Sequence, residues 1–70
     1  MKKIDMVEAP PHYAQLPIQP RVFIIKNELG YAEGNVIKYM CRWKAKGGTE
    51  DLKKARQYID YLLEEVGEDG

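Results

Sequence analysis

Four polar residues in the middle of the chain recur at helical spacing and are the first candidates for chemistry. They are Asn35, Lys38, Arg42 and Lys46. Intervals of three and four positions place them in one stripe along a helix. A guanidinium binds phosphate oxygens through a bidentate fork, and an ammonium adds a point charge. The stripe, extended by Lys53, predicts a phosphate-binding face, although most stripes of this kind are only solvated helix surfaces.

An imidazole and several aromatic rings accompany these charges. His12 and Tyr13 directly follow Pro10-Pro11, a pair that a helix cannot contain, and His12 titrates near neutral pH. The two side chains could bind a phosphate or stack on a base, or they could only pack and cap. Trp43 could also stack on a nucleotide, but we favour core packing for it.

Two acids, Glu33 and Asp51, could act as a general base or hold Mg²⁺. For Glu33 we favour a structural role, as a cap of nearby backbone or a partner of a lysine. Asp51 suits the positive end of a helix dipole. With a single cysteine, Cys41, and a single histidine, the chain forms no internal disulfide and predicts no metal site of its own. Mg²⁺ would be required only for phosphotransfer.

The hydrophobic pattern predicts an all-α fold that positions these groups. We expect one domain, 1–70, with an extended arm at 1–17, helices at about 20–29, 31–46 and 50–66, and a frayed tail at 67–70. A strand is the competing prediction for Val22–Ile25, because this run is β-branched and aromatic.

Glycines mark the expected boundaries. Gly30 would cap the first helix at its C-terminus, and Gly47-Gly48 would turn the chain. Thr49 would be the N-cap of the third helix. A turn this short makes the second and third helices antiparallel, as a helix–Gly-Gly–helix hairpin. Gly34, inside the second helix, indicates that another backbone or a ligand comes close.

The third helix has the longest apolar face. Its members are Leu52, Ala55, Ile59, Leu62, Leu63 and Val66. A chain of 70 residues is near the lower limit of independent stability. We therefore expect a homo-oligomer.

The charge balance limits the function. The chain carries 11 basic and 11 acidic residues, which disfavours bulk nucleic-acid binding. The charges are unevenly spread, since basic residues dominate from Lys38 to Arg56 and no basic residue follows Asp60. The absence of a long apolar run predicts no membrane association. A free cysteine without a signal fits the cytoplasm.

Short strings connect the chain with a known family. They are HY, E-G-N-V-I-K-Y, R-W-K, K-G-G and E-D-L-K-K-A, between His12 and Leu63. With them the chain resembles the bacteriophage SaV-like family, a small domain of unknown function. One relative of that family is a small nucleotide kinase of a short-tailed coliphage, which lacks a P-loop and phosphorylates deoxynucleoside monophosphates. The matching positions in this chain are His12, Asn35, Lys38, Arg42, Trp43 and Lys46.

The resemblance implies a phage-encoded protein in the cytoplasm of an infected bacterium that binds nucleotides or phosphate groups. Kinase-like activity stays open. The chain is much shorter than that kinase, so the resemblance supports nucleotide binding better than it supports catalysis. An alternative is a host-takeover or anti-defence protein that binds a host protein or sequesters a signalling nucleotide. Direct nucleic-acid binding is a third and weaker hypothesis.

Overall fold

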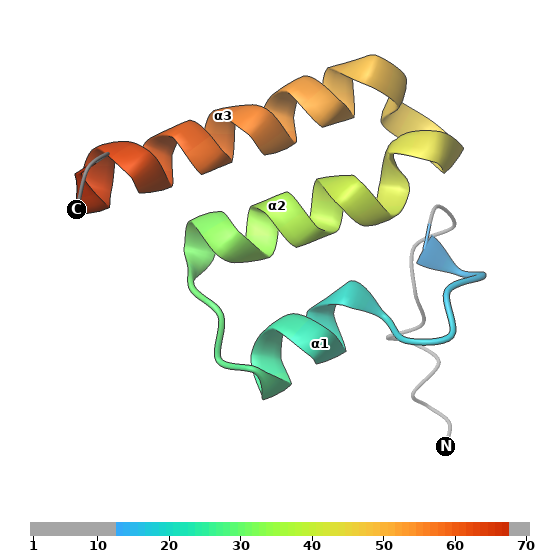
Figure 1. Ribbon diagram of the computed structural model, residues 1–70. Helices are drawn as coiled ribbons and strands as arrows, with labels where there is room; N and C mark the ends of the chain where they lie inside the picture. The colour runs from blue at the N-terminus through green and yellow to red at the C-terminus, as the bar shows by residue number, and fades with distance from the viewer. Residues whose placement is uncertain (1–12, 68–70) are drawn as a thin grey trace.

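The computed structural model describes residues 13–67, and within this range the chain forms helices and turns but no strand (Figure 1). In chain order the elements are α1 (Pro20–Lys26), α2 (Tyr31–Arg42), the π-helical turn η2 (Trp43–Gly47) and α3 (Gly48–Val66). The predicted all-α class is confirmed for this part of the chain. None of these helices is long and apolar enough to cross a membrane.

The segment ahead of α1 folds back on itself. The Leu16 N–H donates to the Tyr13 carbonyl oxygen at 3.0 Å. The Gln19 side-chain amide donates to the same oxygen at 2.8 Å and to the Leu16 carbonyl oxygen at 3.2 Å. From Tyr13 onward the predicted arm is therefore a turn rather than an extended segment. The rest of that arm, including His12, lies outside the described residues, as do residues 68–70 of the predicted tail.

α1 is a helix rather than a strand, and it is shorter than predicted. Pro20 occupies its first turn, where a missing N–H costs no hydrogen bond. The helix ends at Lys26, because the Asn27 side chain donates to the Phe23 carbonyl oxygen at 2.9 Å and Glu28 adopts a positive φ of 56°. Gly30 is the N-cap of α2, so its predicted role as the C-cap of the first helix is wrong.

The connection between α2 and α3 differs from a simple Gly-Gly turn. α2 ends at Arg42, and the next five residues form η2. The Gly48 N–H closes this wider turn by donating to the Trp43 carbonyl oxygen. α3 begins at Gly48, so Thr49 lies inside its first turn, and the N-cap predicted for Thr49 is wrong.

α1, α2 and α3 lie side by side in one layer (Figure 1). The molecule measures 16 Å along its shortest axis, against 48 Å and 27 Å along the other two. α2 and α3 run in opposite directions, and α1 lies along the other side of α2. At Gly34 an added Cβ would meet Ile24 Cγ2 at 3.1 Å. The close approach at Gly34 is thus made by an α1 side chain and not by the backbone or ligand that the sequence predicted.

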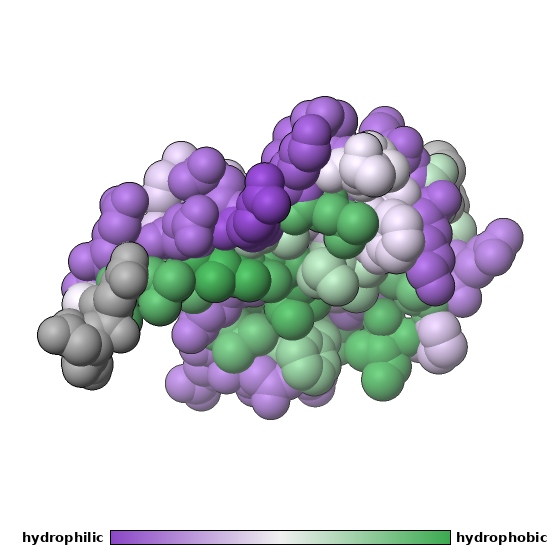
Figure 2. All heavy atoms as spheres, turned by 45° about the horizontal axis from the view of Figure 1, so that its top comes forward, coloured by the Kyte–Doolittle hydropathy of each residue, from purple (hydrophilic) through white to green (hydrophobic). Residues whose placement is uncertain are grey.

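The layer encloses a very small core. Among residues 13–67 the buried hydrophobic side chains are Tyr13 and Ala55, while Asp51 is the most buried side chain of all. Of the predicted apolar face of the third helix, Ile59, Leu63 and Val66 are exposed. Figure 2 shows hydrophobic residues as a band across one face of the molecule, bordered by a hydrophilic ridge. Helix formation alone leaves this band uncovered.

Candidate functional site

A bidentate ion pair joins the end of α2 to the start of α3. Arg42 Nε lies 2.8 Å from Asp51 Oδ2, and Arg42 Nη2 lies 3.1 Å from Asp51 Oδ1. The Asp51 side chain is 1% exposed and the Arg42 side chain 20%. Arg42 is the last residue of α2 and Asp51 lies in the first turn of α3. The intervening turn therefore brings together two residues that the sequence separates by nine positions.

Gly47 makes room for this pair. The Gly47 N–H donates to the Asp51 carboxylate, and a Cβ at Gly47 would overlap that carboxylate. The carboxylate thus lies against the backbone at the junction of η2 and α3. The glycine is required here by space, because its φ of −90° is open to any residue.

The pair changes the protonation of both groups. Its hydrogen bonds with Arg42 hold the pKa of Asp51 below the usual value, and the nearby Lys54 ammonium and Gly47 N–H act in the same direction. The same hydrogen bond raises the pKa of Arg42. Asp51 therefore stays ionised at neutral pH, and its charge cancels that of Arg42.

Aromatic rings surround the guanidinium. The Arg42 Cζ lies 5.0 Å from the centroid of the Tyr39 ring, and the Lys54 ammonium lies 5.6 Å from the same centroid. Both distances are in the range of a cation–π interaction. The buried Tyr13 hydroxyl accepts a hydrogen bond from Arg42 and donates to the Lys38 carbonyl oxygen at 3.5 Å. Burial raises the pKa of Tyr13, although the Arg42 charge opposes the rise.

Two hollows lie between α1 and α2, and Lys38 lines both. One has a volume of about 200 Å³ and is also lined by Tyr13, Gln19, Pro20 and Arg21. The other has about 280 Å³ and is also lined by Ile24, Leu29, Gly30, Tyr31, Gly34 and Asn35. The first combines two cationic side chains with a phenol. The second combines apolar groups with an aromatic ring and an amide.

A larger groove of about 490 Å³ lies at the N-terminal end of α2, beside the C-terminal half of α3. The Tyr58 ring is central here, 5.9 Å from the Tyr31 centroid and 5.5 Å from the Tyr61 centroid, both edge to face. It also stacks on Tyr39 at 6.1 Å. A hydrogen bond with Tyr31, together with burial, raises the pKa of Tyr58 to about 12. This tyrosine cluster joins the groove to the ring beneath Arg42.

Several predicted site residues come together in these places. Tyr13, Arg42 and Asp51 form one contiguous group. Asn35 and Lys38 share a hollow, and the Asn35 amide nitrogen donates to the Tyr31 carbonyl oxygen at 2.9 Å. The phosphate stripe is therefore divided, because Lys38 faces the hollows while Arg42 faces α3.

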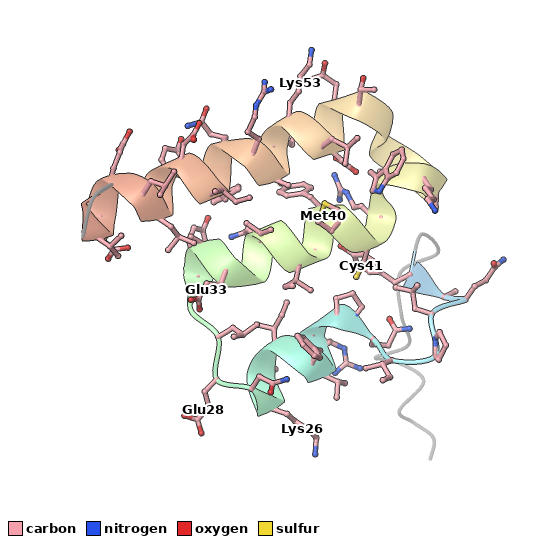
Figure 3. All side chains as sticks on the ribbon, viewed as in Figure 1. Lys26, Glu28, Glu33, Met40, Cys41 and Lys53 are labelled. Carbon is pink, nitrogen blue, oxygen red and sulfur yellow. The ribbon has the colours of Figure 1, made fainter. Side chains whose placement is uncertain are left out.

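Other predicted residues lie apart from this group. Lys46 is exposed in η2, and Trp43 has the Lys44 ammonium 5.7 Å from its ring. Lys53 Nζ lies 3.8 Å from Glu50 Oε2, and its side chain points away from the other helices (Figure 3).

Glu33 has the structural role favoured from its position. Its Oε1 accepts a hydrogen bond from the Gly30 N–H at 2.7 Å, at the N-terminal end of α2 (Figure 3). Residues 13–67 contain no group of three or more His, Cys, Asp or Glu side chains that could hold a metal ion. The two predicted acids, Glu33 and Asp51, are thus separately engaged, one with backbone and one with Arg42.

Sequence analysis missed Arg21 and the pairing of Arg42 with Asp51. Arg21 lies on a helix with a strongly apolar sequence, PRVFIIK, so its charge did not belong to the stripe. A signal for the pair did exist, because two opposite charges flank a turn that contains two glycines. Their side chains could have been expected to meet across the hairpin.

The similarity of this chain to known proteins lies in its sequence. No curated protein and no solved structure matches the chain significantly. Residues 7–60 match a family described as a protein of unknown function, DUF3310. This match covers more than half of the chain, and it includes α1, α2, η2 and the ion pair. The chain therefore belongs to the DUF3310 family.

Proposed function

We propose that this protein binds a nucleotide in the two hollows beside Lys38. The observation that carries the proposal is that one exposed lysine lines both a basic hollow and an aromatic one. A nucleotide has the same division, with an anionic phosphate at one end and a flat base at the other. Tyr31 and Lys38 are separated by roughly 10 Å along the helix axis, at about 1.5 Å per residue. That span matches a mononucleotide.

The phosphate would lie in the hollow of about 200 Å³. Lys38 supplies an ammonium that can neutralise part of the charge of a phosphate dianion, and Arg21 lines the same hollow. The neighbouring Arg42 contributes little net charge, because Asp51 lies within 2.8 Å of it. The role assigned to Arg42 is to hold the Tyr13 hydroxyl and the end of α2 in place.

The base would lie in the hollow of about 280 Å³. Its walls offer the Tyr31 ring for stacking, which is worth roughly 1–3 kcal/mol per base where it has been measured. Asn35 donates its amide N–H to the Tyr31 carbonyl oxygen, so its amide oxygen is available to accept a hydrogen bond from a base. Such a site recognises one hydrogen-bonding edge of the base.

The proposal stops at binding. Glu33 and Asp51 are the acids that phosphotransfer chemistry would require from the predicted site, and each already holds a hydrogen-bonded partner. The resemblance to the SaV-like family and to a coliphage nucleotide kinase supports a nucleotide as the ligand. It also supports a phage-encoded protein acting in the cytoplasm of an infected bacterium.

Calorimetric titration tests this function. We expect heat of binding with deoxynucleoside monophosphates, weaker binding with inorganic phosphate, and none with the unphosphorylated nucleosides at the same concentrations. Lys38→Glu should weaken nucleotide binding at least about tenfold, equal to about 1.4 kcal/mol.

Lys26→Glu is the matched control for this titration. It makes the same charge change on an exposed lysine at the end of α1, whose side chain points away from α2 (Figure 3). It should bind like the wild type. Absence of heat with every nucleotide, or equal effects of the two substitutions, would overturn the proposal.

A further inference from the structure

We propose that the protein dimerises through its apolar face, with α3 packed antiparallel on α3 of a second copy. The apolar face is defined by six exposed side chains, Ile18, Phe23, Met40, Ile59, Leu63 and Val66. This inference is independent of the nucleotide proposal, because it concerns a different side of the layer. Ile37, which borders the apolar face, is about 100° around α2 from Lys38.

The first argument is the missing second layer. Stable domains bury the apolar side of one layer of helices against another layer. Here the smallest dimension is 16 Å, and the buried hydrophobic side chains of residues 13–67 are Tyr13 and Ala55. Face-to-face packing of two copies would create a two-layer structure with a core between the layers.

The second argument is that the exposed apolar residues form one surface. Ile59, Leu63 and Val66 are spaced four and three positions apart, which places them in one stripe along α3. On the side of α1, a hollow of about 280 Å³ is lined by Ile18, Pro20, Phe23, Ile37 and Cys41. Figure 2 shows hydrophobic residues gathered in a band across one face of the molecule. A contiguous apolar surface on a small protein is typical of an interface.

The third argument is charge, and it selects a second copy as the partner. A stripe of charges runs beside the apolar stripe of α3 at intervals of three, four and four residues. It consists of Lys53, Arg56, Asp60 and Glu64. The first two are basic and the last two acidic. Antiparallel packing about a two-fold axis at Ile59 places Lys53 and Arg56 opposite the acids of the other copy, and the acids opposite its bases.

The available area is sufficient. The layer measures 48 Å by 27 Å across its broad dimensions, whereas a standard interface needs about 800 Å² from each partner. In this arrangement Ile59 lies on the axis and contacts its own counterpart. Leu52 lies opposite Val66 of the other copy, which covers both ends of the apolar stripe.

Sedimentation velocity tests the interface. We expect the wild-type chain to sediment as a dimer and Ile59→Glu to raise the dimer dissociation constant at least about a hundredfold, because it buries a charge against its own copy. Ile25→Glu is the matched control: Ile25 is an exposed isoleucine about 200° around α1 from Phe23. It should keep the wild-type mass. A wild-type chain that sediments as a monomer at every concentration over a range of about 100-fold would overturn the proposal.

Charge reversal separates this geometry from other ways of associating. Arg56→Glu and Asp60→Arg should each weaken the dimer, since each places like charges opposite one another. The double variant should restore it, because the reversed charges again face their opposites. If the losses of dimer affinity in the two single variants simply add up in the double variant, antiparallel packing is contradicted.

Cross-linking keeps the proposal testable if Ile59→Glu fails to fold. Ile59→Cys in a Cys41→Ser background should form a disulfide-linked dimer under mild oxidation. Ile25→Cys in the same background should not. Cross-linking of both variants to the same extent, or of neither, would overturn the position assigned to the two-fold axis.

Discussion

The two halves of α3 have similar sequence patterns but opposite surroundings. In the first half, the side chain of Asp51 is 1% exposed and Ala55 is 3% exposed. In the second half, Ile59 is 45% and Val66 is 63% exposed. A carboxylate is thus better buried than an isoleucine two turns further along the same helix.

The difference shows what determines burial in a single layer of helices. The first half of α3 is held by a turn that brings Arg42, Gly47 and Tyr13 around one carboxylate. The second half has α2 on one side and nothing from residues 13–67 over its apolar stripe. Burial at the turn is therefore a property of the polar contacts, whereas the apolar stripe stays exposed in the single chain.

Removal of the Arg42 guanidinium should have the largest effect on the difference in burial between the two halves of α3. Arg42→Met leaves the buried Asp51 without its partner, and breaking one side of a buried ion pair is strongly destabilising. We expect the Tm to fall by about 15 °C in thermal unfolding followed by circular dichroism. Asp51→Asn should cost less, because Arg42 can still reach water. Lys46→Met, an exposed control in η2, should change the Tm by about 2 °C or less.

A substitution of Gly48, where η2 meets α3, should have the next largest effect. Gly48 has φ 59° and ψ −145°, a backbone conformation that side chains with a Cβ rarely adopt. Gly48→Ala should therefore reduce the free energy of unfolding by about 1–3 kcal/mol in urea titration. Gly30→Ala makes the same change at φ −79°, where no strain arises, and an equal loss in both variants would contradict this explanation.

Acid should weaken the first half of α3 selectively. Because Arg42 holds the pKa of Asp51 below its usual value, the unfolded chain takes up a proton before the folded chain as the pH falls. This stabilisation is complete above about pH 4 and is lost as the pH falls through the lower folded pKa. Urea midpoints measured across this range should decline less steeply for Asp51→Asn. A parallel decline would show that other groups are responsible.

The smallest effect concerns the tyrosines of the second half. With a pKa of about 12, Tyr58 should ionise later than an ordinary tyrosine when absorbance is followed in alkaline solution. The raised pKa favours the folded state below about pH 10, and this stabilisation is lost as the pH rises towards 12. Tyr31→Phe removes the hydrogen bond and should lower the pKa of Tyr58. Tyr13→Phe, which removes a phenol hydroxyl near Arg42, should leave the ionisation of Tyr58 unchanged.

Local signals were sufficient for much of the fold. Regular apolar spacing predicted helices, whereas the turn predicted at Gly47-Gly48 is instead the longer η2, Trp43–Gly47. The structural role favoured for Glu33 agrees with the hydrogen bond that it accepts from the Gly30 N–H. The early end of α1 was missed, because it depends on the hydrogen bond from the Asn27 side chain to the Phe23 carbonyl oxygen and on the positive φ of Glu28.

By itself, the sequence determined the all-α class, the approximate extent of α2 and α3, and the presence of an apolar stripe, since all three follow from short-range spacing. The tertiary structure alone decided that Arg42 faces Asp51 and that Lys38 lines two hollows. It also decided that the apolar stripe stays exposed. These outcomes depend on the direction in which η2 turns α3 and on the placing of α1 against Gly34, and both are set by contacts between distant residues.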